Sequence, residues 1–413
     1  MRIAVLAYRG TMTSGGQGIY LYHLTRELAR RGHTVDCYVG PPYPDPMPWA
    51  RVFRVENQRF WGKAFERRPG AFLPRPEPLR IFTPLNFYEF TLSRFGFLTE
   101  PFAFSLRAAR AVVAELRSGV RYDLVHDVQC VSYGLLWLQA LGLPVVTTIH
   151  HPLSIDRRAS LERDRTFLEF KGTLTFYPVR TQRRVARRLD AVLTSSRASA
   201  AELARDYAVP PARLRVVWNG AELPPLAAHR PLPARDEILF VGRCADPNKG
   251  IEFLLEALAR LPDRVSLRVL DHPPGDPKLL RPIRVHGLEG RVRFEGKLPR
   301  VALEEAYRTA SVVALPSLFE GFGLPAVEAL AAGTPVVAAR AGALPEVLEI
   351  AGAGRLVPPR DPGALAAAIA AVLADWPAEH ERACKARARI EAAFSWERVA
   401  ERTESVYREL LSG

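Results

Sequence analysis

The sequence predicts an α/β protein with two domains, each built on a doubly wound parallel sheet. Two segments repeat the same order of strand, glycine-containing loop and helix. One runs from an apolar strand over 2–8 through a loop over 10–18 to a helix over 19–31, and the other from 237–243 through 248–250 to 251–260. In both helices, apolar side chains recur at helical spacing. A chain of 413 residues is also too long for one core and suggests two or three domains of ~150 residues.

Further short apolar runs keep strands and helices alternating, which favours parallel sheets. They cover residues 123–126, 144–149, 191–194, 214–218, 266–270, 292–295, 312–315 and 335–338. A Pro- and Ala-rich stretch over 224–233 is unlike either flank and predicts a linker with a boundary near residue 230. We therefore expect an N-terminal domain over 1–230, a C-terminal domain over 231–395 and an amphipathic terminal helix over 396–413.

Composition excludes several classes of protein. No apolar run approaches the ~18 residues that a membrane span needs, and the N-terminus leads directly into a strand without the pattern of a signal peptide, so we expect a cytoplasmic protein. The four cysteines lie far apart without a CxxC pair, which indicates neither a zinc site nor a disulfide framework. A net charge of +13 is compatible with an anionic partner, although an arginine-rich composition explains part of it.

The segment from Val312 to Glu328 predicts an anion site. An apolar strand enters a loop over 317–323, and Pro325 stands where the first helical position is expected, because its missing N–H costs nothing there. Gly321 and Gly323 allow the backbone to approach a ligand closely. The N–H groups of Phe322, Gly323 and Leu324, together with the helix dipole, suit a diphosphate.

Two carboxylates and two cations accompany that anion site. Glu320 and Glu328 flank it eight residues apart, and carboxylates suit hydroxyl groups because each accepts two or more hydrogen bonds. Taken alone, Glu328 is better explained as an acid that compensates the helix dipole, and the surrounding residues are what favour a binding role. Arg243 and Lys249 follow a strand of the same half, where both side chains can reach one diphosphate.

These motifs, in this order, resemble the retaining GT-B glycosyltransferases of family 4. The matching pieces are Gly15-Gly16-Gln17-Gly18, His150, Val217-Trp218-Asn219-Gly220, Phe240 to Arg243, Asn248-Lys249-Gly250, the EX7E pair Glu320 and Glu328, Gly342 and Pro345-Glu346. They span most of the chain. The loop Ala341-Gly342-Ala343-Leu344 departs slightly, because the family often has a second glycine there.

The resemblance implies a GT-B fold: two Rossmann-like domains facing each other across a cleft, with the C-terminal helix packing back on the N-terminal domain. It implies transfer of a hexosyl group from a UDP- or GDP-sugar to a glycan or lipid-linked acceptor with retention of configuration. No cofactor and no metal are expected, since no DxD motif or ligand cluster is present and cationic side chains can neutralise the diphosphate.

Residue roles follow from the same resemblance, position by position. Arg243 and Lys249 are expected to bind the donor phosphates, Glu328 the ribose hydroxyls and Glu320 the transferred sugar. The amides of Phe322, Gly323 and Leu324 assist the diphosphate. Gly15, Gly16, Gly18 and Asn219 belong to the donor site as well, and His150 lines the sugar pocket.

Three other functions are compatible with parts of this pattern. Glu320 and Glu328 resemble the two carboxylates of a glycosidase, which lie ~5 or ~6.5–9.5 Å apart, but neighbouring cations favour ionised carboxylates and hydroxyl binding. A nucleotide-sugar epimerase on the same fold would release an altered sugar without an acceptor. A membrane-associated scaffold would keep the fold without catalysis.

The acceptor side offers weaker signals. Asp127 ends a strand where open α/β sheets bind ligands and is a candidate acceptor contact, or an ordinary strand-end carboxylate. Aromatic residues concentrate over 60–104, as expected for core helices, an aromatic or lipid-linked acceptor, or a membrane interface. Five arginines are predicted on one helix face, where they are either solvated or rest on anionic headgroups at the inner face of the membrane. They are Arg180, Arg183, Arg184, Arg187 and Arg188. We expect no nucleic-acid partner.

Overall fold

The computed structural model describes residues 1–12, 16–57, 77–226, 236–273 and 277–412, and the side chains of 277–280 are not part of that description. The chain divides into two compact units. The N-terminal unit comprises residues 1–195, 199–217 and 399–413, and the C-terminal unit comprises 196–198 and 218–398. The predicted linker boundary near residue 230 lies outside the described residues.

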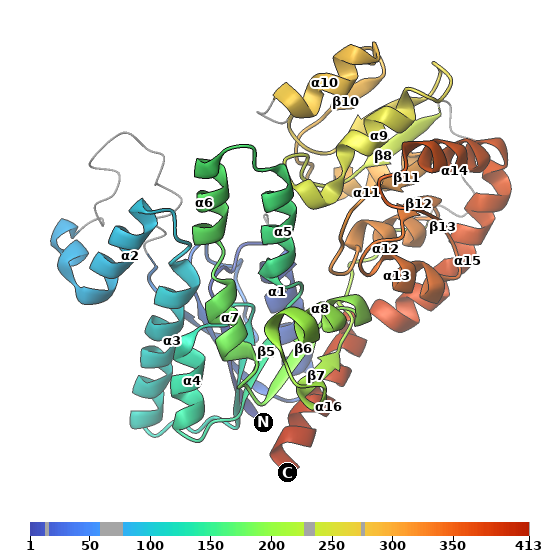
Figure 1. Ribbon diagram of the computed structural model, residues 1–413. Helices are drawn as coiled ribbons and strands as arrows, with labels where there is room; N and C mark the ends of the chain where they lie inside the picture. Colours follow the sequence, from blue (N-terminus) through green and yellow to red (C-terminus); the bar gives the residue numbers. More distant parts are fainter. Residues whose placement is uncertain (13–15, 58–76, 227–235, 274–276, 413) are drawn as a thin grey trace. The chain divides into compact units, whose positions relative to one another are not determined.

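The N-terminal unit is built on a seven-stranded parallel sheet in the order β3-β2-β1-β4-β5-β6-β7 (Figure 1). The strands are β1 (Arg2–Ala7), β2 (Thr34–Val39), β3 (Arg51–Arg54), β4 (Leu124–Val128), β5 (Val145–Thr148), β6 (Ala191–Thr194) and β7 (Leu214–Val216). The strand order reverses direction between β1 and β4, which are hydrogen-bonded neighbours. Such a switch point opens a crevice at the carboxyl ends of the strands, where open α/β sheets bind ligands.

Nine α-helices of the described residues belong wholly or mainly to this unit. They are α1 (Gly16–Arg30), α2 (Pro84–Arg94), α3 (Glu100–Arg117), α4 (Tyr133–Ala140), α5 (Leu153–Arg163), α6 (Phe167–Phe176), α7 (Val179–Ala186), α8 (Arg197–Tyr207) and α16 (Trp396–Ser412). The central strands are buried on both faces; every residue of β4 and β5 is inaccessible or nearly so, including polar residues at their carboxyl ends. Burial on both faces favours apolar residues, which explains the continuous apolar run of β1.

The C-terminal unit repeats the design with a six-stranded parallel sheet in the order β10-β9-β8-β11-β12-β13. Its strands are β8 (Glu237–Phe240), β9 (Ser266–Val269), β10 (Val292–Phe294), β11 (Val312–Leu315), β12 (Val336–Ala339) and β13 (Arg355–Val357). Its helices are α9 (Ile251–Leu258), α10 (Pro277–Val285), α11 (Arg300–Thr309), α12 (Leu324–Ala331), α13 (Leu344–Ala351), α14 (Pro362–Ala374) and α15 (Trp376–Phe394). Here the switch point lies between β8 and β11.

The C-terminal helix returns to the N-terminal unit, as predicted. From Val399 onward, α16 groups with that unit. Its Glu404 pairs with Arg31 at 2.5 Å, and its Tyr407 hydroxyl is hydrogen-bonded to Nδ1 of His126 at the centre of the sheet. Both the beginning and the end of the chain therefore belong to the N-terminal unit.

Two local predictions were wrong. The glycine loop is shorter than 10–18, because α1 already begins at Gly16. Gly18 lies inside this helix, where a Cβ would sit 1.9 Å from the carbonyl oxygen of Thr11, so only glycine fits. The arginine-rich helix α7 ends at Ala186, and Arg187 and Arg188 lie beyond it. Only Arg180, Arg183 and Arg184 of the five therefore lie on the helix, although these three and Arg187 line one hollow.

Candidate functional site

The candidate site of the C-terminal unit lies at the carboxyl ends of β8 and β11. Gly242 and Arg243 follow β8, and the loop over 316–323 follows β11. Because β8 and β11 are neighbours at the switch point, the sequence-predicted groups gather at one edge of the sheet. The side chain of Lys249 runs close to Gly242: a Cβ added to Gly242 would lie 3.3 Å from Cδ of Lys249.

An ion pair joins the segment that follows β8 to the loop that follows β11. Nζ of Lys249 lies 2.6 Å from Oε1 of Glu320, and the Ser317 hydroxyl donates to the same oxygen at 2.9 Å. Gly250 follows Lys249 with φ +61°, and a Cβ there would lie 2.4 Å from the carbonyl oxygen of Pro316. This glycine thus permits the close approach of the two loops that brings the pair together.

The loop that carries Glu320 is also fixed from the other side. The N–H of Ala343 donates to the carbonyl oxygen of Glu320 at 2.9 Å. Gly342 has φ +55°, and a Cβ there would lie 2.2 Å from that same oxygen. Although this loop departs from the family pattern in sequence, its one glycine stands where the backbone of Glu320 leaves no room for a side chain.

The N-terminus of α12 carries the three amides that were expected to bind an anion. Gly323 is the N-cap residue, with φ +92°, and Pro325 occupies the second helical position, one later than predicted. Among the described residues, the N–H groups of Phe322, Gly323 and Leu324 have no hydrogen-bond acceptor. Unpaired amides at a helix N-terminus form an anion site.

Glu328 lies one turn into α12 and is held by two residues that sequence reasoning missed. Nη1 of Arg300 lies 2.8 Å from Oε1 of Glu328, and the Tyr307 hydroxyl donates to Oε2 at 2.8 Å. Only 12% of the Glu328 side chain is exposed. Burial raises the pKa of this carboxyl, and the Arg300 guanidinium partly opposes the rise.

Arg243 differs from the other charged groups of the site. Its side chain is 77% exposed, and its recorded contact is with Asp246 at 3.5 Å. A long, weakly held guanidinium next to an anion site is free to reorient toward a ligand. The structure therefore places Lys249, Glu320 and the α12 amides together, with Arg243 at the same strand edge.

The predicted residues of the N-terminal unit lie near the ends of its own central strands. His150 follows β5, its N–H donates to Oε1 of Gln129 at 3.2 Å, and its ring meets Tyr20 edge-on at 4.7 Å. Gly16 and Gly18 begin α1, and Gly15 lies outside the described residues. Asn219 belongs to the C-terminal unit, where its Oδ1 is buried without a hydrogen-bond partner among the described residues. The donor-site roles of these residues stay predictions.

Asp127 and His126 are buried at the end of β4. Oδ2 of Asp127 accepts from the Val131 N–H at 3.0 Å and from the Thr147 hydroxyl at 2.7 Å. Nε2 of His126 is hydrogen-bonded to the Thr148 hydroxyl at 2.7 Å. Burial, with a smaller contribution from His150, lowers the pKa of His126 to about 3. These contacts fit the interpretation of Asp127 as a strand-end carboxyl, and its acceptor role stays a prediction.

Asp127 also predicts a pH effect. Burial raises the pKa of this carboxyl to about 7, whereas an aspartate in an unfolded chain titrates near ~3.9. Folding therefore takes up a proton between about pH 4 and 7, and the contribution of Asp127 to stability falls as the pH rises through that window. The Asp127→Asn variant keeps an oxygen that accepts both hydrogen bonds but does not titrate. Its melting temperature, measured by calorimetry, should rise relative to the parent protein from about pH 4 to 7 and differ by a constant amount above. A difference independent of pH would contradict this assignment.

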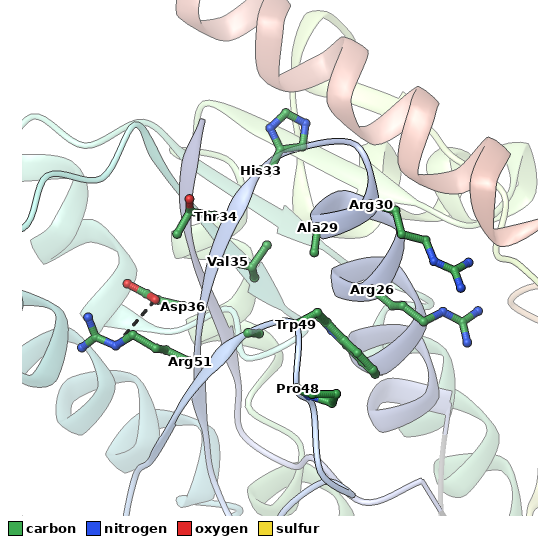
Figure 2. Close-up of a pocket in the computed structure, with 11 residues that line it drawn as sticks. Arg26, Ala29, Arg30, His33, Thr34, Val35, Asp36, Pro48, Trp49 and Arg51 are labelled. Atoms are coloured by element: carbon green, nitrogen blue, oxygen red, sulfur yellow. Dashed lines mark ion pairs between the residues drawn. The ribbon is translucent and has the colours of Figure 1, made fainter.

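A hollow lies at the amino-terminal edge of the N-terminal sheet, opposite the strand ends that carry His150 and Asp127. It has a volume of about 800 Å³ and lies between α1 and the strands β2 and β3, with Trp49, Arg26 and Arg30 around it (Figure 2). Arg26 and Arg30 both pair with Glu27 at 3.0 Å, and Arg51 pairs with Asp36 at 3.9 Å. Its charges are thus largely paired, and we do not assign it to the sugar-transfer site.

Among the described residues, no group of three or more His, Cys, Asp and Glu side chains is arranged to hold a metal ion. None of the described helices has the length and apolar character needed to span a bilayer.

Comparison with known proteins decides the family. Residues 14–223 match the model described as Glycosyltransferase Family 4, and residues 228–391 match Glycosyl transferases group 1. The MMP alpha-(1->4)-mannosyltransferase of Mycolicibacterium hassiacum is 38% identical over 420 residues, covering 100% of this chain and 99% of that protein. The chain belongs to glycosyltransferase family 4.

The glycosyltransferase has further relatives of full length. The D-inositol 3-phosphate glycosyltransferase of Xylanimonas cellulosilytica is 32% identical over 425 residues, covering 96% of this chain and 92% of that protein. Among solved structures, the sucrose-phosphate synthase of Thermosynechococcus elongatus superposes with a TM-score of 0.72 at 26% identity, covering 100% of this chain and 99% of that one. The two parallel sheets and these neighbours confirm the predicted GT-B fold and the glycosyltransferase class.

Proposed function

We propose that this glycosyltransferase transfers a hexosyl group from a nucleotide-diphosphate sugar to a glycan or lipid-linked acceptor, with retention of anomeric configuration. The observation that carries the proposal is the Lys249–Glu320 pair beside the unpaired amides of α12. It sets a cation and a helix N-terminus, which suit a diphosphate, next to a carboxylate, which suits sugar hydroxyls.

In this proposal, the two carboxylates bind different parts of the donor. Glu320, near Lys249, is suited to the hydroxyls of the transferred sugar. Glu328, one turn into α12, is suited to the ribose. Arg300 and Tyr307 each engage one of its oxygens, but a carboxylate oxygen accepts two hydrogen bonds, so capacity remains. Arg300 and Tyr307 then serve as positioning residues that fix this carboxylate.

Charge stabilisation is the main catalytic device in this proposal. Breaking the bond between the sugar and the diphosphate places negative charge on the leaving phosphate oxygen. Lys249, Arg243 and the α12 amides neutralise that charge, and we propose that they do so without a metal ion. With front-face attack, the leaving oxygen accepts the proton of the attacking hydroxyl, and no protein nucleophile takes part.

The name of the Mycolicibacterium relative suggests the first donor to test. That protein is named for an α-(1→4) mannosyl transfer. A product with an α linkage made from an α-linked nucleotide sugar retains its configuration, in agreement with the proposed course. A mannosyl donor therefore comes first, followed by glucosyl donors on either nucleotide.

A donor panel tests the proposal. The protein is mixed with GDP-mannose, UDP-glucose, GDP-glucose or the free nucleotides, and its melting temperature is measured for each. A donor present at 100 times its dissociation constant stabilises the folded state by ~2.7 kcal/mol, so one donor should raise the melting temperature and be slowly hydrolysed. If no nucleotide sugar or nucleoside diphosphate changes the melting temperature at millimolar concentration, the proposal is wrong.

A further inference from the structure

A cavity of about 460 Å³ lies within the N-terminal unit, at the carboxyl end of β4. Its walls come from α2, the start of α3, the loop over 130–133, Arg157 of α5 and the segment that joins α6 to α7. This edge adjoins the switch point between β1 and β4, where open α/β sheets bind ligands. Its volume is typical of a small-molecule site.

Six aromatic rings line the cavity. The lining rings are Tyr88, Phe97, Phe102, Tyr133, Phe176 and Tyr177. The ring of Phe102 lies 5.0 Å from that of Tyr88 and meets Tyr133 edge-on at 6.2 Å. The apolar surface continues outside along α6, which buries none of its residues and exposes Phe167 and Leu168 almost fully. Such a continuous apolar surface suits a ligand with an extended apolar chain.

Among the described residues, the charged side chains that line this cavity are two arginines, Arg157 and Arg180. Neither has a carboxylate partner among the described residues. The neighbouring Arg158, in contrast, pairs with Glu202 and Asp206 at 2.5 Å each. The cavity therefore carries unneutralised positive charge beside apolar walls, which complements an anionic group on an apolar ligand.

A buried hydroxyl adds a second indication of a ligand. Ser132 lines the cavity with 1% of its surface exposed, and its Oγ has no hydrogen-bond partner among the described residues. Buried polar groups without a hydrogen-bond partner are rare, and a bound ligand would supply the partner that this hydroxyl lacks. The residue before it, Val131, has φ +46°, a conformation that a β-branched residue seldom adopts, and Asp127 holds it there.

We propose that this cavity binds the acceptor, and that the acceptor is an amphiphile with an apolar chain and a phosphate group. The inference rests on the proposed transfer of sugar. A plain glycan would leave both arginines without an anion, and a bare phosphate would leave the aromatic walls without a partner. The aromatic walls and α6 hold the chain, while Arg157, Arg180 and the Ser132 hydroxyl hold the phosphate.

Calorimetric titration with dodecyl phosphate, kept below its critical micelle concentration, tests the proposal. The parent protein should bind it at a saturable 1:1 ratio, more tightly than dodecyl maltoside or inorganic phosphate. Arg180→Gln should weaken binding about tenfold, since a hydrogen bond to a charged group contributes ~1.5 kcal/mol and ~1.4 kcal/mol is a factor of ten. Arg184→Gln is the matched control, because Arg184 lies one turn farther along α7 and does not line this cavity. Leu174→Ser should weaken dodecyl phosphate but not inorganic phosphate.

The other outcomes overturn the proposal. Equal affinity for inorganic phosphate and dodecyl phosphate would make this a phosphate site alone. Flotation with phosphatidylglycerol vesicles without binding of monomeric dodecyl phosphate would make the surface a membrane contact. Slow donor hydrolysis, measured on the same preparations, separates the two proposals: hydrolysis without amphiphile binding refutes only the acceptor, and amphiphile binding without any donor binding refutes the sugar transfer.

Discussion

Replacing Arg243 by alanine should lower the rate of sugar transfer roughly 100- to 1000-fold, as expected when one donor to a developing negative charge is lost. The melting temperature should hardly change, because the side chain is 77% exposed and weakly held by Asp246. Steady-state kinetics with the donor found in the panel measures the first effect, and calorimetry the second.

Arg264→Ala is the matched control for this variant. Arg264 is 71% exposed and also pairs with an aspartate, Asp236, but it precedes β9 and so lies at the amino-terminal edge of the same sheet. Its loss should leave the rate unchanged. Equal effects of the two substitutions would show that net charge, not position at the β8 and β11 ends, explains the result.

Replacing Glu328 by glutamine should raise the donor KM roughly 10- to 100-fold, because a charged acceptor of hydrogen bonds contributes ~1.5–3 kcal/mol. The change in kcat should be smaller, since the ribose is bound alike in the ground state and the transition state. The variant also leaves Arg300 facing a neutral amide, so a moderate loss of thermal stability is expected.

Two further variants separate binding from stability at Glu328. Tyr307→Phe removes one hydrogen bond to Oε2 but keeps the carboxylate, and it should change the donor KM much less than Glu328→Gln. Arg300→Gln breaks the ion pair and should lower stability about as much as Glu328→Gln. If Glu328→Gln lowered stability as much as Arg300→Gln but left the donor KM unchanged, Glu328 would be a structural residue and its ribose role would be refuted.

The sequence predicted those parts of the fold that local patterns encode. Both central switch-point strands, β8 and β11, are apolar runs, and Gly250 and Gly323 stand where left-handed backbone is needed. Three strands were missed: β2, β3 and β13. In β2, Thr34 and Asp36 interrupt the apolar residues, β3 is mostly exposed and β13 has only three residues, so none of them forms a clear apolar run.

The site was predicted where a motif lies in one segment and missed where contacts are distant in sequence. Glu320 and Glu328 belong to one loop and helix, and Lys249 to a recognisable turn. Arg300, in contrast, approaches Glu328 across 28 residues from the start of another helix, and no local pattern marks it. The cavity at Arg157, Arg180 and Ser132 likewise depends on how separate helices pack, which only the structure shows.

The most direct test of sugar transfer from a nucleotide donor is proton NMR of the products formed from an α-linked nucleotide sugar in the presence of acceptor. We predict a new α-linked glycoside, released together with the nucleoside diphosphate in equal amount. A β-linked product would refute retention, and an altered sugar formed without acceptor would show an epimerase in place of a transferase.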